Sequence, residues 1–222
     1  DVRVRQAFSL ALDRWAFQAI FAPGDPPRSL FLATSPFVNS DYLQWPGWNK
    51  DTKDADIAKA KELMAAAGFP DGFTTEIICR DDWVPTCESW VNEMPKLGIK
   101  ASIKPVGRVE HQEISCDGRF AAMSTGGPNL TQMVPWAGKL EMGSVDANAC
   151  GNTRHQDAKV DELFDKMAAT SDVAVQAPLA QEVERIIMRD QVYYSAPNFV
   201  RYYAYRSYVK GINPPVSAHI NY

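Results

Sequence analysis

The spacing of the cysteines and histidines excludes the common metal sites. The cysteines stand at positions 79, 87, 116 and 150, and the histidines at 111, 155 and 219. No two cysteines form a CxxC motif, and no histidine stands at the spacing of a zinc ligand. The sequence therefore predicts no metal site and no cofactor. The even number of cysteines is compatible with an oxidising compartment.

The cysteines are better explained as structural residues. Nothing in the sequence marks any of them as an activated nucleophile, so buried thiols or a pair of disulfides are the simpler interpretation. Cys79 and Cys87 are the nearest pair along the chain. A bond between them would close the loop that holds Trp83.

Enzyme motifs are also missing. No serine lies in a GxSxG motif, and Gly126-Gly127 fits neither a Walker loop nor a GxGxxG turn. Glu110 and Glu113 flank His111 on a polar segment, where a solvated helix face explains them better than a catalytic pair. We therefore expect no enzyme, with an α/β hydrolase or transferase that uses one cysteine or histidine as the alternative.

Tryptophans near loops offer a different chemistry, the stacking of a ligand. Trp45, Trp48 and Trp83 lie in or beside predicted loops, and Trp136 follows a glycine-rich break. Aromatic rings suit stacking on a bound solute. Rings that pack under long loops are at least as common, so both interpretations stay open.

Length and composition are those of an ordinary globular chain. The chain has 222 residues, with 23 Lys and Arg against 27 Asp and Glu, which gives a net charge of −4. This mild acidity argues against a nucleic-acid partner, which normally meets a basic patch. No apolar run approaches the ~20 residues of a membrane helix.

The hydrophobic periodicity predicts alternating helices and strands. Helices are expected over residues 1–21, 54–67, 84–97, 156–169 and 174–189, with a weaker one over 109–114. Strands are expected over 73–79, 99–105 and 120–123, and the stretch 192–205 is strand-like. Pro95 should kink the third helix. The long loop 25–53 is expected to be functional or ordered by packing. This alternation predicts an α/β fold with a mainly parallel or mixed sheet flanked by helices.

Several segments together resemble one protein family. The chain resembles the extracytoplasmic solute-binding proteins of peptide, opine and nickel ABC importers, the large dipeptide- and oligopeptide-binding class. The segments that carry the resemblance, in chain order, are 1–7 (DVRVRQA), 11–14 (ALDR), 56–64 (DIAKAKELM), 67–73 (AGFPDGF), 97–100 (LGIK), 117–120 (DGRF) and 208–211 (YVKG).

The resemblance implies a periplasmic-binding-protein-like lobe. Residues 1–211 would form the second, C-terminal lobe of a clamshell, and residues 212–222 would begin the return toward a first lobe that this sequence lacks. The chain would then be an excised, trimmed or partly defined piece of a periplasmic or extracytoplasmic receptor. The implied partners are a small solute, the missing first lobe and the membrane permease of the importer.

The site is expected at the carboxyl ends of the strands, where α/β folds bind ligands. Two segments lie at these strand ends, one beginning at Cys79 and one beginning at Ser124. The candidate binding residues in and after them are Arg80, Trp83, Gly126, Gly127, Asn129 and Trp136. In peptide-binding relatives the second segment typically reads Gly-Trp-x-x-Asp-x-x-Asp-Pro, and an aspartate holds the peptide's amino terminus. This chain has no acidic residue from Ser124 to Trp136, so it offers no charged partner there for an ammonium group.

Arg80 suggests the charge of the ligand. Its guanidinium can pair with a carboxylate, which favours an anionic, opine-like or sugar-like ligand over a peptide with a free amine. It can equally bridge Asp81 or Asp82 at the surface. The expected function is capture of a small solute, peptide-like, opine-like or sugar-like, by closure of two lobes. A lobe that serves only as an interaction module is the other alternative.

Overall fold

The computed structural model describes residues 1–21, 23–31, 33, 35–123, 155–191, 194, 206 and 208–210. The elements follow in the order α1 (Val2–Ala11), α2 (Arg14–Phe21), α3 (Lys53–Ala66), β1 (Thr74–Arg80), α4 (Val84–Val91), β2 (Lys100–Val106), α5 (Arg108–Asp117), β3 (Ala122–Met123), α7 (Ala158–Ala168) and α8 (Val173–Asp190). Short 3₁₀ helices lie at Tyr42–Gln44, Lys50–Thr52, Asp81–Trp83 and Met94–Leu97. Of the predicted tail strand only Tyr194 is described, and the predicted return segment 212–222 lies outside the described residues.

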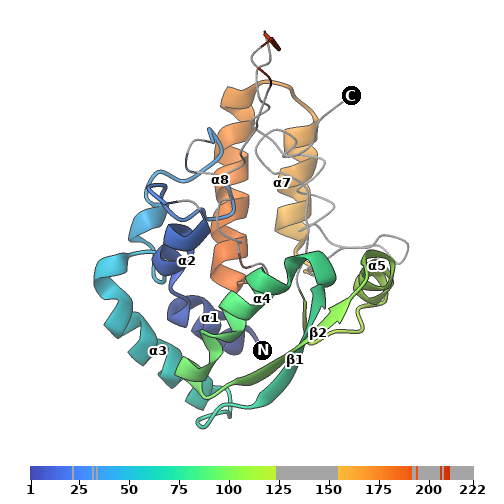
Figure 1. Ribbon diagram of the computed structural model, residues 1–222. Helices are drawn as coiled ribbons and strands as arrows, with labels where there is room; N and C mark the ends of the chain where they lie inside the picture. Colours follow the sequence, from blue (N-terminus) through green and yellow to red (C-terminus); the bar gives the residue numbers. More distant parts are fainter. Residues whose placement is uncertain are drawn as a thin grey trace.

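Within the described part of the chain, three strands form one parallel sheet in the order β2–β1–β3. β1 and β2 pair along their whole length, from Thr74 opposite Lys100 to Arg80 opposite Val106. Parallel neighbours need crossover connections, and α4 and α5 lie in those connections beside the strands (Figure 1). The predicted α/β class with a mainly parallel sheet is confirmed.

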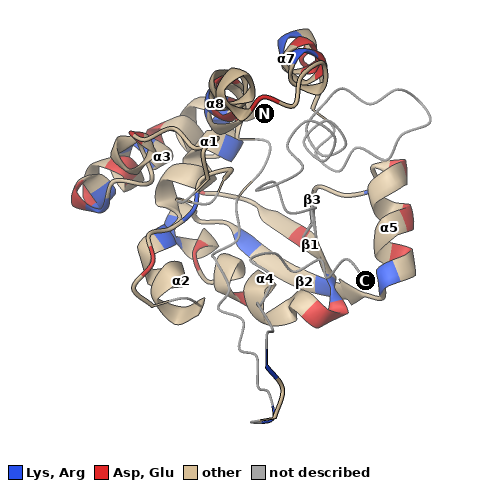
Figure 2. Cartoon of the chain, turned by 90° about the horizontal axis from the view of Figure 1, so that it is seen from above, with Lys and Arg blue, Asp and Glu red and all other residues tan. Residues whose placement is uncertain are grey.

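The two faces of the sheet serve different cores, because successive strand side chains point in opposite directions. Ile77 packs with α1, α3 and the 94–97 turn, whereas Ile78 packs with Val106 and with Ile114 of α5. Viewed from above, the sheet separates α5 from α1 and α3 (Figure 2). Both faces of the sheet are therefore packed against helices.

The single helix predicted over residues 1–21 is wrong, because the chain breaks at Leu12 and Asp13. Leu12 has an extended backbone with φ −64° and ψ 122°. Lys53 Nζ donates to the Leu10 and Leu12 carbonyls at 3.0 and 2.9 Å, which caps the carboxyl end of α1 with a positive charge. The apolar periodicity runs through the break, but Asp13 Oδ1 accepts from the Ala16 amide at 2.9 Å and so caps the start of α2.

Buried Arg14 stabilises the break between α1 and α2. Its Nη1 donates to the carbonyls of Ser9 and Gly47 at 2.6 and 3.0 Å, and its Nη2 donates to Ser9 Oγ at 2.8 Å. The guanidinium lies 3.7 Å from the ring centroid of Trp48. Burial lowers the pKa of Arg14 to about 9, so the side chain stays charged at neutral pH.

The predicted helix over residues 84–97 ends early, at Val91. Pro95 lacks an amide hydrogen and cannot continue an α-helix, and the chain proceeds as the 3₁₀ turn Met94–Leu97 to Gly98 at φ 71°. A Cβ on Gly72 would lie 2.2 Å from the Gly98 backbone. This close approach brings together the turns that precede β1 and β2.

A second core joins α7 and α8 to the long loop before α3. The predicted apolar stripe of α7 is buried, whereas in the stripe predicted for α8 Leu179 and Ile186 are only partly buried. Both helices meet large loop side chains; the buried members of this core are Leu30, Phe31, Phe37, Tyr42, Trp48, Val160, Leu163, Phe164, Met167, Ala180, Val183, Ile187 and Met188. The two helices stand side by side (Figure 1). The loop is therefore ordered by packing, one of its two expected roles.

Side-chain caps begin both of these helices. Asp157 accepts from the Lys159 amide at 2.8 Å, and Asp172 accepts from the Ala174 amide at 2.9 Å. We expect Asp172→Ala to lower the free energy of unfolding by about 1 kcal/mol, the usual contribution of an N-cap. Urea unfolding followed by circular dichroism measures the change, and Asp172→Asn, which preserves the acceptor, should recover most of it.

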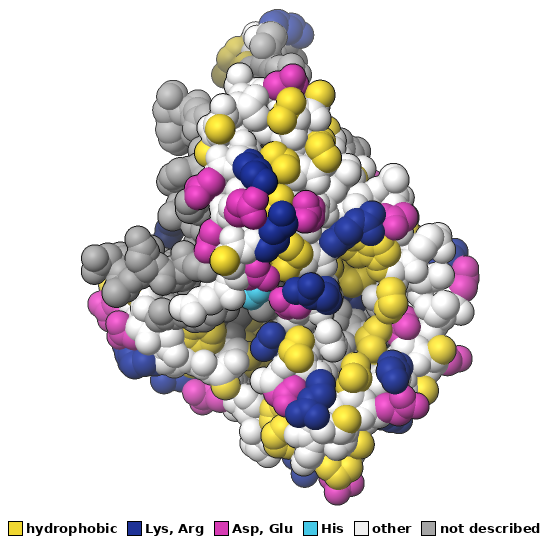
Figure 3. Space-filling model, turned by 180° about the vertical axis from the view of Figure 1, so that it is seen from behind, with side chains coloured by type: hydrophobic (Ala, Val, Ile, Leu, Met, Phe, Trp, Pro, Cys, Tyr) yellow, Lys and Arg dark blue, Asp and Glu magenta, His cyan; other side chains and the backbone are white. Residues whose placement is uncertain are grey.

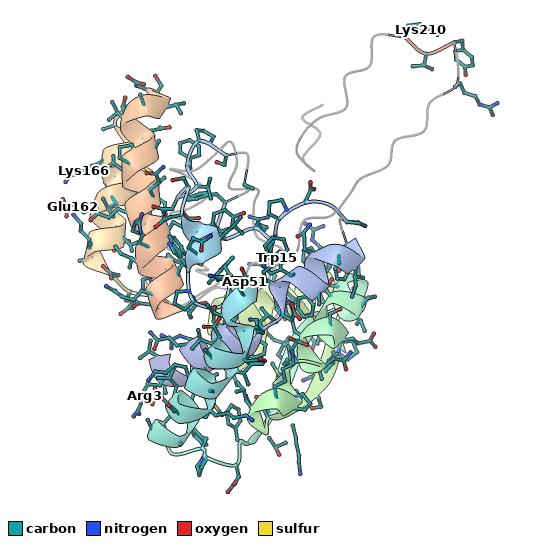
Figure 4. The ribbon with its side chains drawn as sticks, turned by 90° about the vertical axis from the view of Figure 1, so that its left-hand side faces the viewer. Arg3, Trp15, Asp51, Glu162, Lys166 and Lys210 are labelled. Atoms are coloured by element: carbon teal, nitrogen blue, oxygen red, sulfur yellow. A yellow bond between two sulfur atoms is a disulfide. The ribbon has the colours of Figure 1, made fainter. Side chains whose placement is uncertain are left out.

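The outer surface mixes charges of both signs. On the rear face, basic and acidic side chains are interspersed (Figure 3). On α7, Glu162 accepts from Lys166 one turn later, and both point into solvent (Figure 4). Within the described residues, no helix is both long and apolar enough for a membrane span.

Candidate functional site

The carboxyl ends of the three strands lie at one edge of the sheet. The strands are parallel, and Arg80 at the end of β1 lies opposite Val106 at the end of β2. β3 pairs with Ile77 and Ile78 and ends at Met123. The edge predicted to bind ligand is thus present, and Arg80 and Trp83 lie on it.

Arg80 and Trp83 are brought together by the 3₁₀ turn Asp81–Trp83. The Arg80 guanidinium carbon lies 5.2 Å from the centroid of the Trp83 ring, a cation–π contact. Its Nε and Nη2 donate to the two carboxylate oxygens of Asp82 at 2.5 and 2.8 Å. The bridge to Asp82 that the sequence left open is therefore formed. The Arg80 side chain is 19% exposed, against 60% for Asp82.

The charge balance of this turn includes a residue that the sequence reasoning missed. The hydrogen bond from Arg80 holds the pKa of Asp82 below its usual value, and the positive charges of Arg80 and Arg108 act in the same direction. Arg108 is the first residue of α5 and follows the end of β2 directly after Gly107. Its place after a strand end was the signal that could have found it.

A disulfide closes the same segment. Cys79 and Cys87 are bonded, with their Cα atoms 6.5 Å apart, and both are buried. The pairing proposed from the sequence is therefore confirmed. Cys116 is also disulfide-bonded, and no free cysteine is found in the described part of the chain.

The remaining predicted site residues cannot be placed. Gly126, Gly127, Asn129 and Trp136 lie outside the described residues. Their segment follows the end of β3 at Met123 directly in the sequence. Their binding role stays a prediction.

Two tryptophans follow the packing alternative that the sequence left open. Trp48 is 2% exposed and belongs to the core formed with α7 and α8, and Trp45 packs against that core. Their rings contact each other edge-on at 6.3 Å. Trp15 contacts the same loop, because its indole Nε1 donates to the Trp48 carbonyl at 2.8 Å and Lys50 Nζ lies 5.9 Å from its ring centroid.

Two other groups of polar residues each combine a histidine with two acidic residues. Glu110 and Glu113 are exposed as expected, but His111 between them is buried, so the face of α5 is not uniformly solvated. The ligand atoms of His155, Asp157 and Asp190 lie within 4.8 Å of one another.

The carboxylates of Asp157 and Asp190 in this second group already have partners within the protein. Arg189 pairs with Asp190 at 2.6 and 3.0 Å, and Asp157 caps α7. The Arg189 hydrogen bonds, followed by the bond from His155, hold the pKa of Asp190 below its usual value. The arrangement is that of an ion-pair network at the junction of α7 and α8.

Comparison with known proteins decides the family. The model of the bacterial extracellular solute-binding proteins, family 5 Middle, matches residues 1–134. The chain belongs to this family. Members of family 5 are extracellular, so the predicted extracytoplasmic location is confirmed and suits the disulfides. No match was found among the curated proteins.

Solved structures confirm the family 5 fold. HbpA2 from Haemophilus parasuis matches with a TM-score of 0.65 and 25% identity, over 86% of this chain and 38% of its own length. DppA from Helicobacter pylori in complex with peptide STSA matches with 0.65 and 18%, over 86% and 37%. AgaA in complex with agropinic acid, from A. tumefaciens R10, matches with 0.64 and 20%, over 86% and 39%. The chain thus spans less than two fifths of the length of these structures.

Proposed function

We propose that residues 1–211 form the second lobe of an ABC-importer receptor, which captures a small solute without chemical turnover. The observation that carries the proposal is the family match over residues 1–134 together with the fraction of each related structure that the chain covers. In the whole protein, a first lobe would close over the strand ends by hinge motion. The closed receptor would then deliver the solute to a membrane permease.

The ligand proposed for this lobe carries a carboxylate. Arg80 is a basic side chain at the end of β1, and its guanidinium makes a cation–π contact with Trp83. An arginine beside an aromatic ring suits a planar anion. The peptide STSA and agropinic acid, bound by proteins of similar fold, are both compounds with a carboxyl group.

The proposal is tested by equilibrium binding to the 222-residue chain. Two-dimensional NMR of the tryptophan indole groups can detect weak binding, which is expected when one lobe supplies the contacts. The two probes are N-acetyl-alanyl-alanine and its neutral C-terminal amide. Saturable shifts of the Trp83 signal with the acid, and no conversion of the probe, would support the proposal. Product formation that one cysteine or histidine substitution abolishes would establish the enzyme alternative.

Substitutions of the Arg80–Asp82 pair should change affinity in opposite directions. We expect Arg80→Gln to weaken binding of the acid at least about tenfold, or roughly 1.4 kcal/mol, and to leave binding of the amide unchanged. Asp82→Asn should tighten binding of the acid, because the ligand no longer competes with Asp82 for the guanidinium. NMR titration measures both.

A matched control exists on α8. Arg185 also pairs with an aspartate, Asp41, at 3.3 Å and lies 5.5 Å from a tryptophan ring, that of Trp45. Arg185→Gln should leave both affinities unchanged. Equal losses in the Arg80 and Arg185 variants would show that the effect is one of general charge and would refute a role for Arg80.

A further inference from the structure

The segment that carries Arg80 and Trp83 is a small covalent ring. Cys79 lies in β1 next to Arg80, and Cys87 lies in α4, with a sequence separation of 8 between them. Both cysteines are buried, at 0% and 1% exposure. The ring therefore has two fixed ends in the packed core and an outward arc at the strand ends.

The arc has few packing contacts of its own. Asp81, Asp82 and Pro85 are exposed, and Trp83 and Val84 are only partly buried. Contacts within the turn include the Arg80–Asp82 pair, the contact between Arg80 and the Trp83 ring, and the bond from the Asp82 amide to Asp81 Oδ1 at 2.8 Å. The Arg80–Asp82 pair is bidentate and orients the guanidinium, while Asp82 itself is 60% exposed.

The Cys79–Cys87 disulfide fixes the chain on both sides of the Arg80–Trp83 turn, in β1 and in α4. Neighbouring strand residues face opposite sides, so Cys79 is tied toward α4 while the Arg80 side chain leaves on the other side. Cys87 fixes the first turns of α4, which follow Trp83 directly. With both ends held, the guanidinium and the indole ring have little freedom to separate.

We propose that the Cys79–Cys87 disulfide is a positioning element of the ligand site, which holds Arg80 and Trp83 in the geometry that selects a carboxylate. This inference rests on the proposed function, since it deepens the role given there to Arg80. The cysteines contact no ligand themselves. Their effect on binding acts through the direction of two side chains.

The test is a double-mutant cycle between the disulfide and Arg80. The variants are Cys79→Ala with Cys87→Ala, Arg80→Gln, and the three changes combined. Should the alanine pair fail to fold, Cys79→Val with Cys87→Ala restores volume. Each folded variant is titrated with N-acetyl-alanyl-alanine and with its amide, well below its melting temperature. Cys116→Ala, which breaks the other disulfide, is the control.

The readout is the preference for the acid over the amide, which a loss of stability alone would not change. We expect this preference to fall at least tenfold without the Cys79–Cys87 bond, and Arg80→Gln to add almost nothing further, because both changes remove one interaction. The Cys116→Ala variant should keep the wild-type preference. Hydrogen exchange at the amides of residues 81–84 and 86 should accelerate at least tenfold in the alanine pair, with or without solute.

Each outcome decides the inference. A preference within twofold of wild type, fully additive losses, or unchanged hydrogen exchange in the arc would overturn it while the proposed function stands. If the wild-type chain binds neither probe, the proposed carboxylate site fails and the inference fails with it. The two failures are thus distinguished by the wild-type titration alone.

Discussion

Replacing Trp48 with alanine should lower the free energy of unfolding by about 4 kcal/mol, within the range for deleting a buried aromatic side chain. The ring is 2% exposed and lies in the core formed with α7 and α8. It also covers the buried guanidinium of Arg14, at 3.7 Å, and its Nε1 donates to the Arg28 carbonyl at 3.3 Å. The substitution therefore leaves a cavity and exposes a buried cation. Urea unfolding followed by circular dichroism measures the loss.

Trp45 is the matched control in the same loop. It is only partly buried, and its ring lies 5.5 Å from the exposed Arg185. Trp45→Ala should lower the free energy of unfolding by about 1–2 kcal/mol, since less apolar surface returns to water. A Trp48→Ala loss no larger than that of Trp45→Ala would contradict the central packing role of Trp48.

Replacing Glu184 with leucine should lower the free energy of unfolding by about 3 kcal/mol or more. Glu184 lies in α8 with no exposed surface. Its carboxylate accepts from Ser29 Oγ and from the amide and side chain of Asn39, the last two at 2.7 and 2.6 Å. Leucine keeps an apolar volume but leaves these buried donors without their acceptor, at roughly 1–3 kcal/mol each. Urea unfolding of the variant tests this expectation.

Glu184→Gln separates the charge from the hydrogen bonds. Burial raises the pKa of Glu184 above its usual value, so the folded protein binds this proton more tightly than the unfolded chain. The resulting stabilisation is complete below the unfolded pKa of about 4.3 and is lost as the pH rises through the native pKa. We therefore expect wild type to gain stability relative to Glu184→Gln as the pH falls from 7 toward 4.

Unfolding experiments at several pH values can contradict the raised pKa of Glu184. Unfolding curves of wild type and Glu184→Gln at several pH values give the difference in stability at each pH. A difference that is constant between pH 7 and 4, or one that shifts toward the glutamine variant on acidification, would show that the native pKa of Glu184 is not raised. Leucine should remain less stable than glutamine at every pH.

Local patterns in the sequence correctly predicted most elements. The stripe of Val160, Leu163, Phe164 and Met167 is buried as expected, and Gly98 ends the turn that follows α4. Helices and strands of this kind depend on side-chain spacing and on caps a few residues away, and both can be recognised in a single sequence. The Cys79–Cys87 bond was predictable for the same reason, because its ends are close in sequence.

Contacts between distant residues were not predictable. The carbonyls at the end of α1 are capped by Lys53, about forty residues away, and the loop before α3 is tied to α8 through Asn39 and Glu184. The loop position of Trp48 suggested ligand stacking, whereas its partners on α7 and α8 bury it. No local pattern shows which remote surface a loop residue will meet.

The sequence by itself determined the fold class and the family resemblance, because these follow from periodicity and short motifs; the place of the site at the strand ends stays a prediction. Only the tertiary structure decided that Arg80 pairs with Asp82, stacks on Trp83 and has Arg108 as a neighbour. It also decided which aromatic rings belong to the core. Charge balance and burial arise when distant segments meet, and their energies depend on neighbours that sequence order does not specify.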